Sequence, residues 1–278
     1  MRHALSTHLF VNQRLSNSLL DKISSAGIEA VELFCARQHL DYRNDDQIRE
    51  LGLFLRDAPL KVHSIHLPMF SDDCWGKTGP QSVIDIANPT KIKRIAAVDE
   101  AKRALDLADT IPFSFAVQHI GVGFDDDWSM RKVDAAFDSL DELKSFGRQR
   151  GVDILVENIP NALSSAKKIV EFFQATHLKL GVCLDIGHAN MMEGVEDTFE
   201  LLKDRIRSLH IHDNNGTDDK HLFPMVHEGG TVDWKITMKL LKTLHAEVPM
   251  LLELKEDPEM ADPLDRAKEV FEKLENLS

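Results

Sequence analysis

The sequence predicts a single (β/α)8 barrel, or TIM barrel, in which residues 1–278 form one domain. Three observations favour this fold class. Short apolar, β-branched runs alternate with longer amphipathic runs along the whole chain. Eight such pairs fill 278 residues, an ordinary length for one α/β barrel. The first strand-like run leads into Val11-Asn12-Gln13-Arg14, without the glycine-rich phosphate loop expected in an open dinucleotide-binding sheet.

The predicted elements follow one another without a linker or a repeat of fixed period. Strands are expected at 4–10, 29–34, 61–67, 115–120, 153–158, 180–185, 207–212 and 249–254. Helices are expected near 16–26, 46–57, 91–109, 129–150, 164–175, 196–204, 234–246 and 263–276. Gly27, Gly147 and Gly151 stand where helices should end. The irregular stretch 68–90 is the longest loop, and a loop of that length is usually functional.

The net charge, hydropathy and cysteine content of the sequence argue against some classes of binding partner and cellular location. The net charge of −13 argues against a surface that grips nucleic acid by charge alone, and no apolar run is long enough to span a membrane. Cys35, Cys74 and Cys183 are far apart, which indicates free thiols in a reducing compartment. Since the first residues also lack the apolar region of a signal peptide, we expect a cytoplasmic location.

The residue types at the ends of the predicted strands point to a metal site. In such barrels the active site lies at the carboxyl ends of the strands. Carboxylate or imidazole side chains end strands three to eight, namely His66, His119, Glu157, Asp185, His210 and Glu253. The loop after strand seven adds Asp219, His221, His227 and Glu228. These are the ligand types that hard or borderline divalent ions take. The sequence therefore predicts a divalent-metal site at the mouth of the barrel.

Individual assignments remain open at this stage. Glu157 alone could be a structural carboxylate, and a lone His66 or His119 is more often a satisfied core histidine than a ligand. His63 and His66 are three residues apart, so only one of them is expected to face the barrel interior. His210 and His212 are two residues apart on one predicted strand, so both side chains can face inward. One would then be a metal ligand, and the other would lie behind it or towards substrate.

Several motifs resemble the xylose isomerase-like barrel superfamily, which includes sugar and sugar-phosphate isomerases, ketose 3-epimerases and the endonuclease IV class of abasic-site (AP) nucleases. These motifs are Glu157-Asn158, Asp185-Ile186-Gly187-His188-Ala189-Asn190, His210-Ile211-His212-Asp213-Asn214, Asp219-Lys220-His221 and Gly229-Gly230-Thr231-Val232-Asp233-Trp234. The resemblance extends from strand three to strand eight. It is specific for the superfamily and does not select a member.

The epimerase branch implies one divalent ion, manganese, magnesium, cobalt or zinc, held by Glu157, Asp185, His210 and Glu253. Alignment on Asp213 selects His210, and the alternative register puts His212 on the metal. The resemblance also implies that Glu157 and Glu253 transfer the proton through an enediolate. His66, His119, His188 and His212 are then expected to contact a sugar, sugar-phosphate or cyclic-polyol substrate. A homodimer is an expectation from the resemblance alone.

The nuclease branch implies three zinc ions on nine ligands. The additional ligands would be His66, His119, His188, Asp219 and His221. Two departures disfavour this alternative, because the sequence has His119-Ile120-Gly121 where the nuclease has His-Pro-Gly and His227-Glu228-Gly229 where it has Gly-Glu-Gly. The acidic runs Asp72-Asp73, Asp125-Asp126-Asp127 and Asp218-Asp219 would also repel a DNA duplex. A third interpretation is a barrel that binds a ligand without catalysis.

Overall fold

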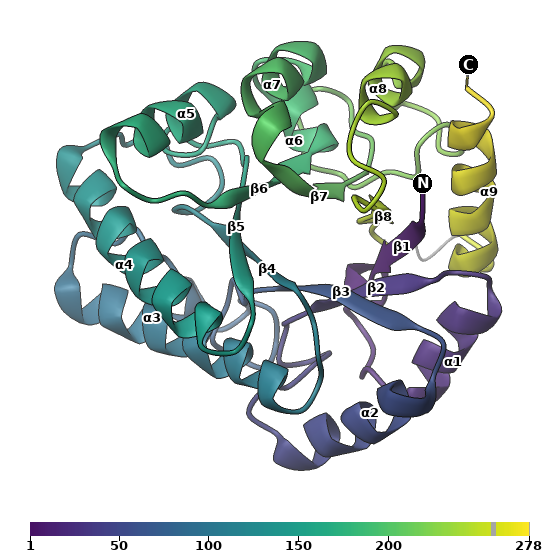
Figure 1. Cartoon of the computed structure of the whole chain (residues 1–278), viewed down its shortest axis with the longest axis horizontal. Helices are drawn as coiled ribbons and strands as arrows, with labels where there is room; N and C mark the ends of the chain where they lie inside the picture. The colour runs from purple at the N-terminus through teal and green to yellow at the C-terminus, as the bar shows by residue number, and fades with distance from the viewer. Residues whose placement is uncertain (257–259, 278) are drawn as a thin grey trace.

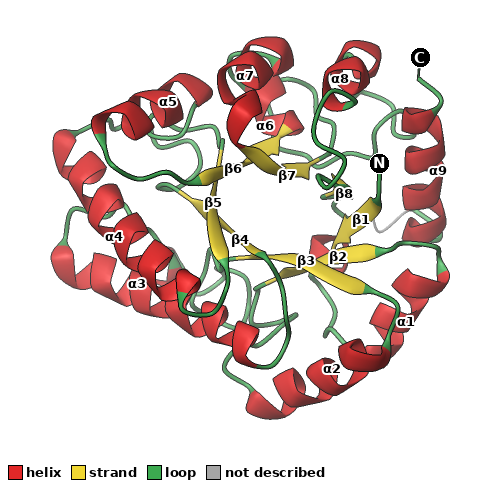
Figure 2. Ribbon diagram, viewed as in Figure 1, coloured by secondary structure: helices red, strands yellow, loops and turns green. Residues whose placement is uncertain are grey.

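A computed structural model describes residues 1–256 and 260–277, and it shows eight parallel strands in a nearly closed barrel surrounded by helices (Figures 1 and 2). The prediction of a (β/α)8 barrel is confirmed. The strands are β1 (His3–Ser6), β2 (Ala30–Phe34), β3 (Lys61–His66), β4 (Phe115–His119), β5 (Asp153–Glu157), β6 (Gly181–Asp185), β7 (Ile206–His210) and β8 (Met250–Leu252).

Nine α-helices lie in the described ranges, and most of them form the outer ring in Figure 1. They are α1 (Asn17–Ser25), α2 (Asp45–Asp57), α3 (Lys91–Leu105), α4 (Met130–Arg148), α5 (Ala166–Ala175), α6 (Ile186–Met191), α7 (Val195–Leu202), α8 (Trp234–Leu241) and α9 (Pro263–Glu275). Short 3-10 turns occupy η1 (Thr7–Phe10), η2 (Pro80–Ser82), η3 (Asp106–Asp109) and η4 (Lys203–Arg205). None of the helices in the described residues combines the length and apolar character needed to cross a membrane.

Local sequence explains why these helices form and how they face the barrel. In α1 the Ser16 hydroxyl accepts a hydrogen bond from the Leu19 amide, so it caps the first turn. Leu19, Leu20 and Ile23 recur at helical spacing and are buried against the strands. The same amphipathic pattern packs the ring of helices onto the barrel and buries one large apolar core.

The barrel closes between β7 and β8, which are the two ends of the strand order β7-β6-β5-β4-β3-β2-β1-β8. Ile211, just after β7, forms a parallel bridge with Leu252 of β8. The Ile211 amide donates to Leu251 O at 2.9 Å, and the Glu253 amide donates to Ile211 O at 3.1 Å. These backbone bonds hold Glu253 beside the end of β7, at the mouth.

The first predicted strand, 4–10, is too long. The chain leaves the sheet after Ser6 and forms η1, in which the Ser6 hydroxyl accepts from the His8 amide. The Thr7 hydroxyl accepts from the Phe34 amide at 2.9 Å and fixes this turn to β2. Side chain–backbone bonds of this kind compete with strand pairing, and here they bring His8 to the mouth.

The expectation that only one of His63 and His66 faces the barrel interior is wrong. His63 Nε2 lies 3.2 Å from the Ser208 hydroxyl on β7, a strand on the opposite side of the barrel. The pairing of β2 with β3 shifts register here, since Val31 pairs with Val62 and Glu32 pairs with Ser64. A bulge adds one residue and breaks the alternation of side chains, so His63, Ser64 and His66 all reach the interior.

Candidate metal centre

Four of the predicted side chains meet at the mouth of the barrel. Glu157, Asp185 and His210 are the last residues of β5, β6 and β7, and Glu253 follows β8. Each offers a ligand atom, and these atoms all lie within 4.8 Å of one another. All four side chains are buried. Adjacent parallel strands that end at the same level account for this convergence, since Asp185 pairs directly with His210 across β6 and β7.

His210 lies at the centre of this group. Its Nδ1 is 3.1 Å from Glu157 Oε1, 3.2 Å from Glu253 Oε2 and 3.8 Å from Asp185 Oδ2. Its Nε2 faces the other way, 3.1 Å from Oε1 of Glu32. The imidazole therefore presents Nδ1 to three carboxylates. Three carboxylates and one imidazole, all buried, are a donor set that fits a divalent ion with oxygen and nitrogen preference.

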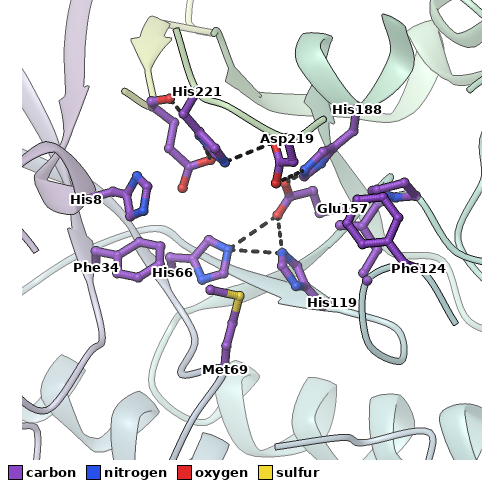
Figure 3. Close-up of a pocket in the computed structure, with 14 residues that line it drawn as sticks. His8, Phe34, His66, Met69, His119, Phe124, Glu157, His188, Asp219 and His221 are labelled. Atoms are coloured by element: carbon purple, nitrogen blue, oxygen red, sulfur yellow. Dashed lines mark hydrogen bonds and ion pairs between the residues drawn. The ribbon is translucent and has the colours of Figure 1, made fainter. Parts of the chain in front are cut away.

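A second group joins the ends of β3, β4 and β5. His119 Nε2 lies 3.0 Å from Glu157 Oε2, and His66 Nε2 lies 3.4 Å from the same oxygen (Figure 3). The two histidine nitrogens are 3.2 Å apart. Glu157 therefore belongs to two groups, with one carboxylate oxygen towards His210 and the other towards His66 and His119.

A third group lies on the other side of Glu157 and consists of His188, His212, Asp219 and His221. Asp219 is its centre, because His188 Nε2 and His221 Nε2 each lie 3.2 Å from one of its oxygens (Figure 3). Asp219 and His221 come from the loop after β7, and His188 comes from α6, a short helix that the sequence analysis did not predict.

Backbone carbonyl groups fix the tautomers of three mouth histidines. Nδ1 of His66, His188 and His221 lies 2.8–3.0 Å from the carbonyl oxygens of Leu67, Asn158 and Glu253. A carbonyl only accepts, so Nδ1 carries a hydrogen in each ring, and in the neutral form of the ring Nε2 keeps its free electron pair. In each case Nε2 is the nitrogen that faces the carboxylates. This is the arrangement by which proteins orient histidine ligands.

His212 is not among the described residues that line the cavity at the mouth. Its Nε2 lies 3.1 Å from Asp185, and its ring stacks on His221 with centroids 3.9 Å apart. Gly187 makes room for this ring, because a β-carbon at that position would overlap the imidazole. His212 therefore supports Asp185 from behind, while His210 faces the carboxylate group.

Burial and neighbouring charges shift the pKa values of the site residues in opposite directions. Burial raises the pKa of Glu157, but His210 and His119 more than offset it, so the pKa lies well below its ordinary value. Burial lowers the pKa of His221, yet Asp219 raises it to about 9. The pKa of His188 is likewise raised, against burial, by Asp185 and Asp219. The carboxylates therefore favour the protonated forms of His188 and His221.

These groups open into a cavity of about 140 Å³ (Figure 3). Its polar lining consists of His8, His66, His119, Glu157, His188, Asp219, His221 and Glu253, and its apolar lining of Phe34, Met69, Gly123, Phe124, Ile159 and Pro160. No lysine or arginine of the described chain lines it. The loop 68–90 contributes Met69 to the rim, and its Trp75 packs on Phe34 with ring centroids 5.1 Å apart.

Two residues of the mouth were missed by the sequence analysis. Glu32 lies inside β2 rather than at its end, although a charged residue in the apolar run Ala30–Phe34 was a signal. His8 has no such signal, because a strand predicted over 4–10 gives no reason to place it at the mouth. The η1 turn directs its ring towards Phe34 and His221, with centroids 4.7 and 5.0 Å apart.

Comparison with known proteins identifies the family. Residues 20–277 match the family described as xylose isomerase-like TIM barrel, and the chain belongs to it. Two relatives are uncharacterized proteins of Methanocaldococcus jannaschii. One is 28% identical over 80% of this chain and 74% of its own length. The other is 26% identical over 98% of this chain and all of its own length.

Solved structures with the same fold include sugar epimerases. A D-tagatose 3-epimerase-like protein is 23% identical with a TM-score of 0.77, over 99% of this chain and 97% of its own. The D-allulose 3-epimerase of Methylomonas sp., in complex with D-allulose, is 16% identical with a TM-score of 0.75, over 100% and 98%. The IolI protein, with a bound zinc atom, is 16% identical with a TM-score of 0.73, over 99% and 98%.

Proposed function

We propose that the protein is a divalent-metal-dependent isomerase or epimerase that acts on a sugar, a sugar phosphate or a cyclic polyol. One observation carries the proposal. Glu157 and Glu253 come from different strands, reach the same buried imidazole at 3.1 and 3.2 Å, and both line the cavity. Two carboxylates that share one small cavity can remove a proton from a carbon and return a proton to it or to its neighbour.

Glu157, Asp185, His210 and Glu253 would hold the ion. Their oxygen and nitrogen donors suit manganese, magnesium, cobalt or zinc, and zinc is bound in the IolI structure of the same fold. When bound, such an ion polarises a carbonyl group and acidifies the adjacent C–H bond. The enclosed cluster supports the metal proposal, because three carboxylates and one histidine share one buried space, where negative charges need a cation or a proton to balance them.

The protein's own groups would then bind and orient the substrate. Glu157 is anionic at neutral pH, since its pKa is lowered by His210 and His119 against the effect of burial. Its carboxylate can therefore accept a proton from the substrate carbon, and Glu253 on the other side can supply one. Nε2 of His66, His119 and His188 faces the same space, within reach of substrate hydroxyl groups. The apolar rim around Phe34 and Met69 limits the entry of water.

The similarity to a D-allulose 3-epimerase makes free ketohexoses the first substrates to test. The metal-stripped protein is reloaded with each of the four ions and incubated with a panel of ketoses in deuterated water. We expect conversion with deuterium incorporated next to the carbonyl. E157Q and E253Q should reduce conversion by about 100-fold or more, because each removes a proton-transfer group. Absence of exchange with every sugar and polyol in the panel would contradict the proposal.

A second candidate function is hydrolysis of abasic nucleic acid by three clustered zinc ions. The observation that favours it is that the groups centred on His119 and Asp219 flank the group around His210. The lining of the cavity argues against it, because no lysine or arginine of the described chain faces it. Arg37, on the loop after β2, is paired with Asp41 at 3.1 Å.

Metal content and substrate distinguish the two functions. Elemental analysis of the purified protein should give one ion per chain for the isomerase and three zinc ions for the hydrolase. Cleavage of an oligonucleotide that contains one abasic site, with an intact duplex as control, measures the second activity directly. Cleavage without ketose conversion would replace the first proposal by the second.

A further inference from the structure

We propose that Glu32 is a positioning residue that orients His210 and fixes its tautomer for metal binding. The inference rests on the proposed function, because it assumes that His210 is a ligand. Glu32 belongs to β2 and does not line the cavity, so it is not among the groups that contact substrate. It acts on the site through a single neighbour, the imidazole of His210.

The contact between the two side chains is close and fully enclosed. His210 Nε2 lies 3.1 Å from Oε1 and 3.3 Å from Oε2 of Glu32. Both residues have 0% of their surface exposed. A buried carboxylate without a partner is costly, and His210 is the cationic or N–H partner that this carboxylate has. Each side chain of this pair therefore satisfies the other's buried polar group, which fixes both in place.

The orientation of Glu32 is itself fixed from both sides of its strand. The Ser6 hydroxyl on β1 lies 3.1 Å from Oε1, and the Ser64 hydroxyl on β3 lies 2.8 Å from Oε2. Ser64 reaches this position because the register of β2 and β3 shifts between Val31 and Glu32. The Ser6 and Ser64 hydroxyl groups thus hold both carboxylate oxygens of Glu32 in place. Residues that hydrogen-bond to a metal ligand commonly orient that ligand in this way.

This arrangement decides which nitrogen of His210 is free. Carboxylates face both nitrogens of His210. An ion held beside Nδ1 would displace the proton there and leave the hydrogen of the neutral imidazole on Nε2, where Glu32 accepts it. Nδ1 then keeps its electron pair, and this is the nitrogen that faces Glu157 and Glu253 at 3.1 and 3.2 Å. His66, His188 and His221 use the opposite tautomer, fixed by backbone carbonyl groups. Among residues 1–256 and 260–277 no carbonyl is paired with Nε2 of His210, and Glu32 takes that place.

The test measures Mn²⁺ affinity, with the free ion followed by electron paramagnetic resonance. We expect E32A to weaken binding about 10- to 100-fold, the usual effect of losing such a partner. E32Q should recover most of the affinity, because its amide oxygen can still accept from Nε2. S64A should weaken binding in the same direction by a smaller factor, because the carboxylate remains but loses one of its supports.

Two controls separate positioning from general destabilisation. Glu100 is also a buried carboxylate, paired with Tyr42, Arg43 and Arg103, and none of these four residues lines the cavity. E100A should lower the stability of the fold and leave Mn²⁺ affinity unchanged. In an H210A background, E32A should have no further effect on affinity, since a positioning residue acts only through its ligand.

The outcomes distinguish this inference from the proposed function. If the wild-type protein binds Mn²⁺ and E32A, folded as judged by circular dichroism, binds it equally well, the role of Glu32 is refuted and the metal site stands. If E32A and H210A have additive effects, Glu32 acts elsewhere and the inference is also refuted. If the wild-type protein binds no Mn²⁺, Co²⁺ or Zn²⁺, the proposed function itself fails and the inference fails with it.

Discussion

At the scale of single residues, the contact between Gly187 and His212 links packing to the site. Gly187 follows β6 in α6, and a β-carbon there would overlap the His212 imidazole. That ring contacts Asp185 at 3.1 Å and stacks on His221. Any side chain at 187 must therefore displace His212 and, with it, the support of a proposed ligand.

We expect G187A to destabilise the protein by about 1–3 kcal/mol, the usual cost of overfilling a packed site. It should also weaken Mn²⁺ binding, because Asp185 loses its neighbour. Urea unfolding and metal titration measure the two effects. G123A is the matched control, since a β-carbon at Gly123 meets nothing within 4 Å. Equal stability and metal affinity of G187A and the wild type would contradict the prediction.

At the scale of elements, Asp213 holds the long loop between β7 and α8. Its carboxylate accepts from the amides of Asn214, Thr231 and Val232 at 2.8–3.2 Å and from Trp234 Nε1 at 2.6 Å. Its backbone pairs with Leu222 in both directions. Since Asp219 and His221 belong to this loop, one buried carboxylate determines whether the third group of the site assembles.

We expect D213A to increase amide hydrogen exchange across 214–232 and to leave the protection of α1 to α5 unchanged, because four donors lose their acceptor in one loop. Hydrogen exchange followed by mass spectrometry measures this. The control is D233A, which removes the N-cap of α8 (Asp233 accepts from the Ile236 amide at 3.0 Å). D233A should cost about 1 kcal/mol of stability without opening the loop, and equal exchange in the two variants would refute this account.

At the scale of the whole molecule, two sets of buried histidines give stability a maximum in pH. Burial lowers the pKa of His39 and His63 to about 4. Between pH 4 and 6.5 the unfolded chain therefore binds more protons than the folded one, and stability rises with pH. The pKa of His221 is raised to about 9, against the effect of burial, by Asp219. Between pH 6.5 and 9 the folded chain binds more protons, and stability falls.

For the protein in excess chelator, we expect the free energy of unfolding to be greatest near pH 6.5. Each pKa unit corresponds to ~1.4 kcal/mol, so His39 alone accounts for up to ~3 kcal/mol of the acid limb. Urea unfolding at pH 4.5 to 9 measures the curve. Saturating Zn²⁺ should reduce the alkaline fall, because ligand histidines bind metal in the neutral form. A stability that rises steadily from pH 6.5 to 9 in chelator would refute this prediction.

Much of the fold could be predicted because its signals are local. Amphipathic spacing such as that of Leu19, Leu20 and Ile23 decides where helices form, and apolar runs decide where strands form. The carboxylates and histidines that end strands three to eight follow from the same alternation. The position of His8 and the inward turn of His63 could not be predicted, because a 3-10 turn and a bulge are fixed by contacts between strands.

The sequence by itself determined the class of fold and the chemical types of side chain at the mouth, because hydrophobic periodicity and strand ends are properties of short segments. Only the tertiary structure placed His210, and not His212, beside Glu157 and Glu253, because the two histidines are two residues apart and strand alternation alone does not separate them. That choice depends on barrel closure at Ile211 and Leu252, on the space above Gly187, and on Glu32 behind His210. Distances between separate strands are set by register and closure, and these have no local signal.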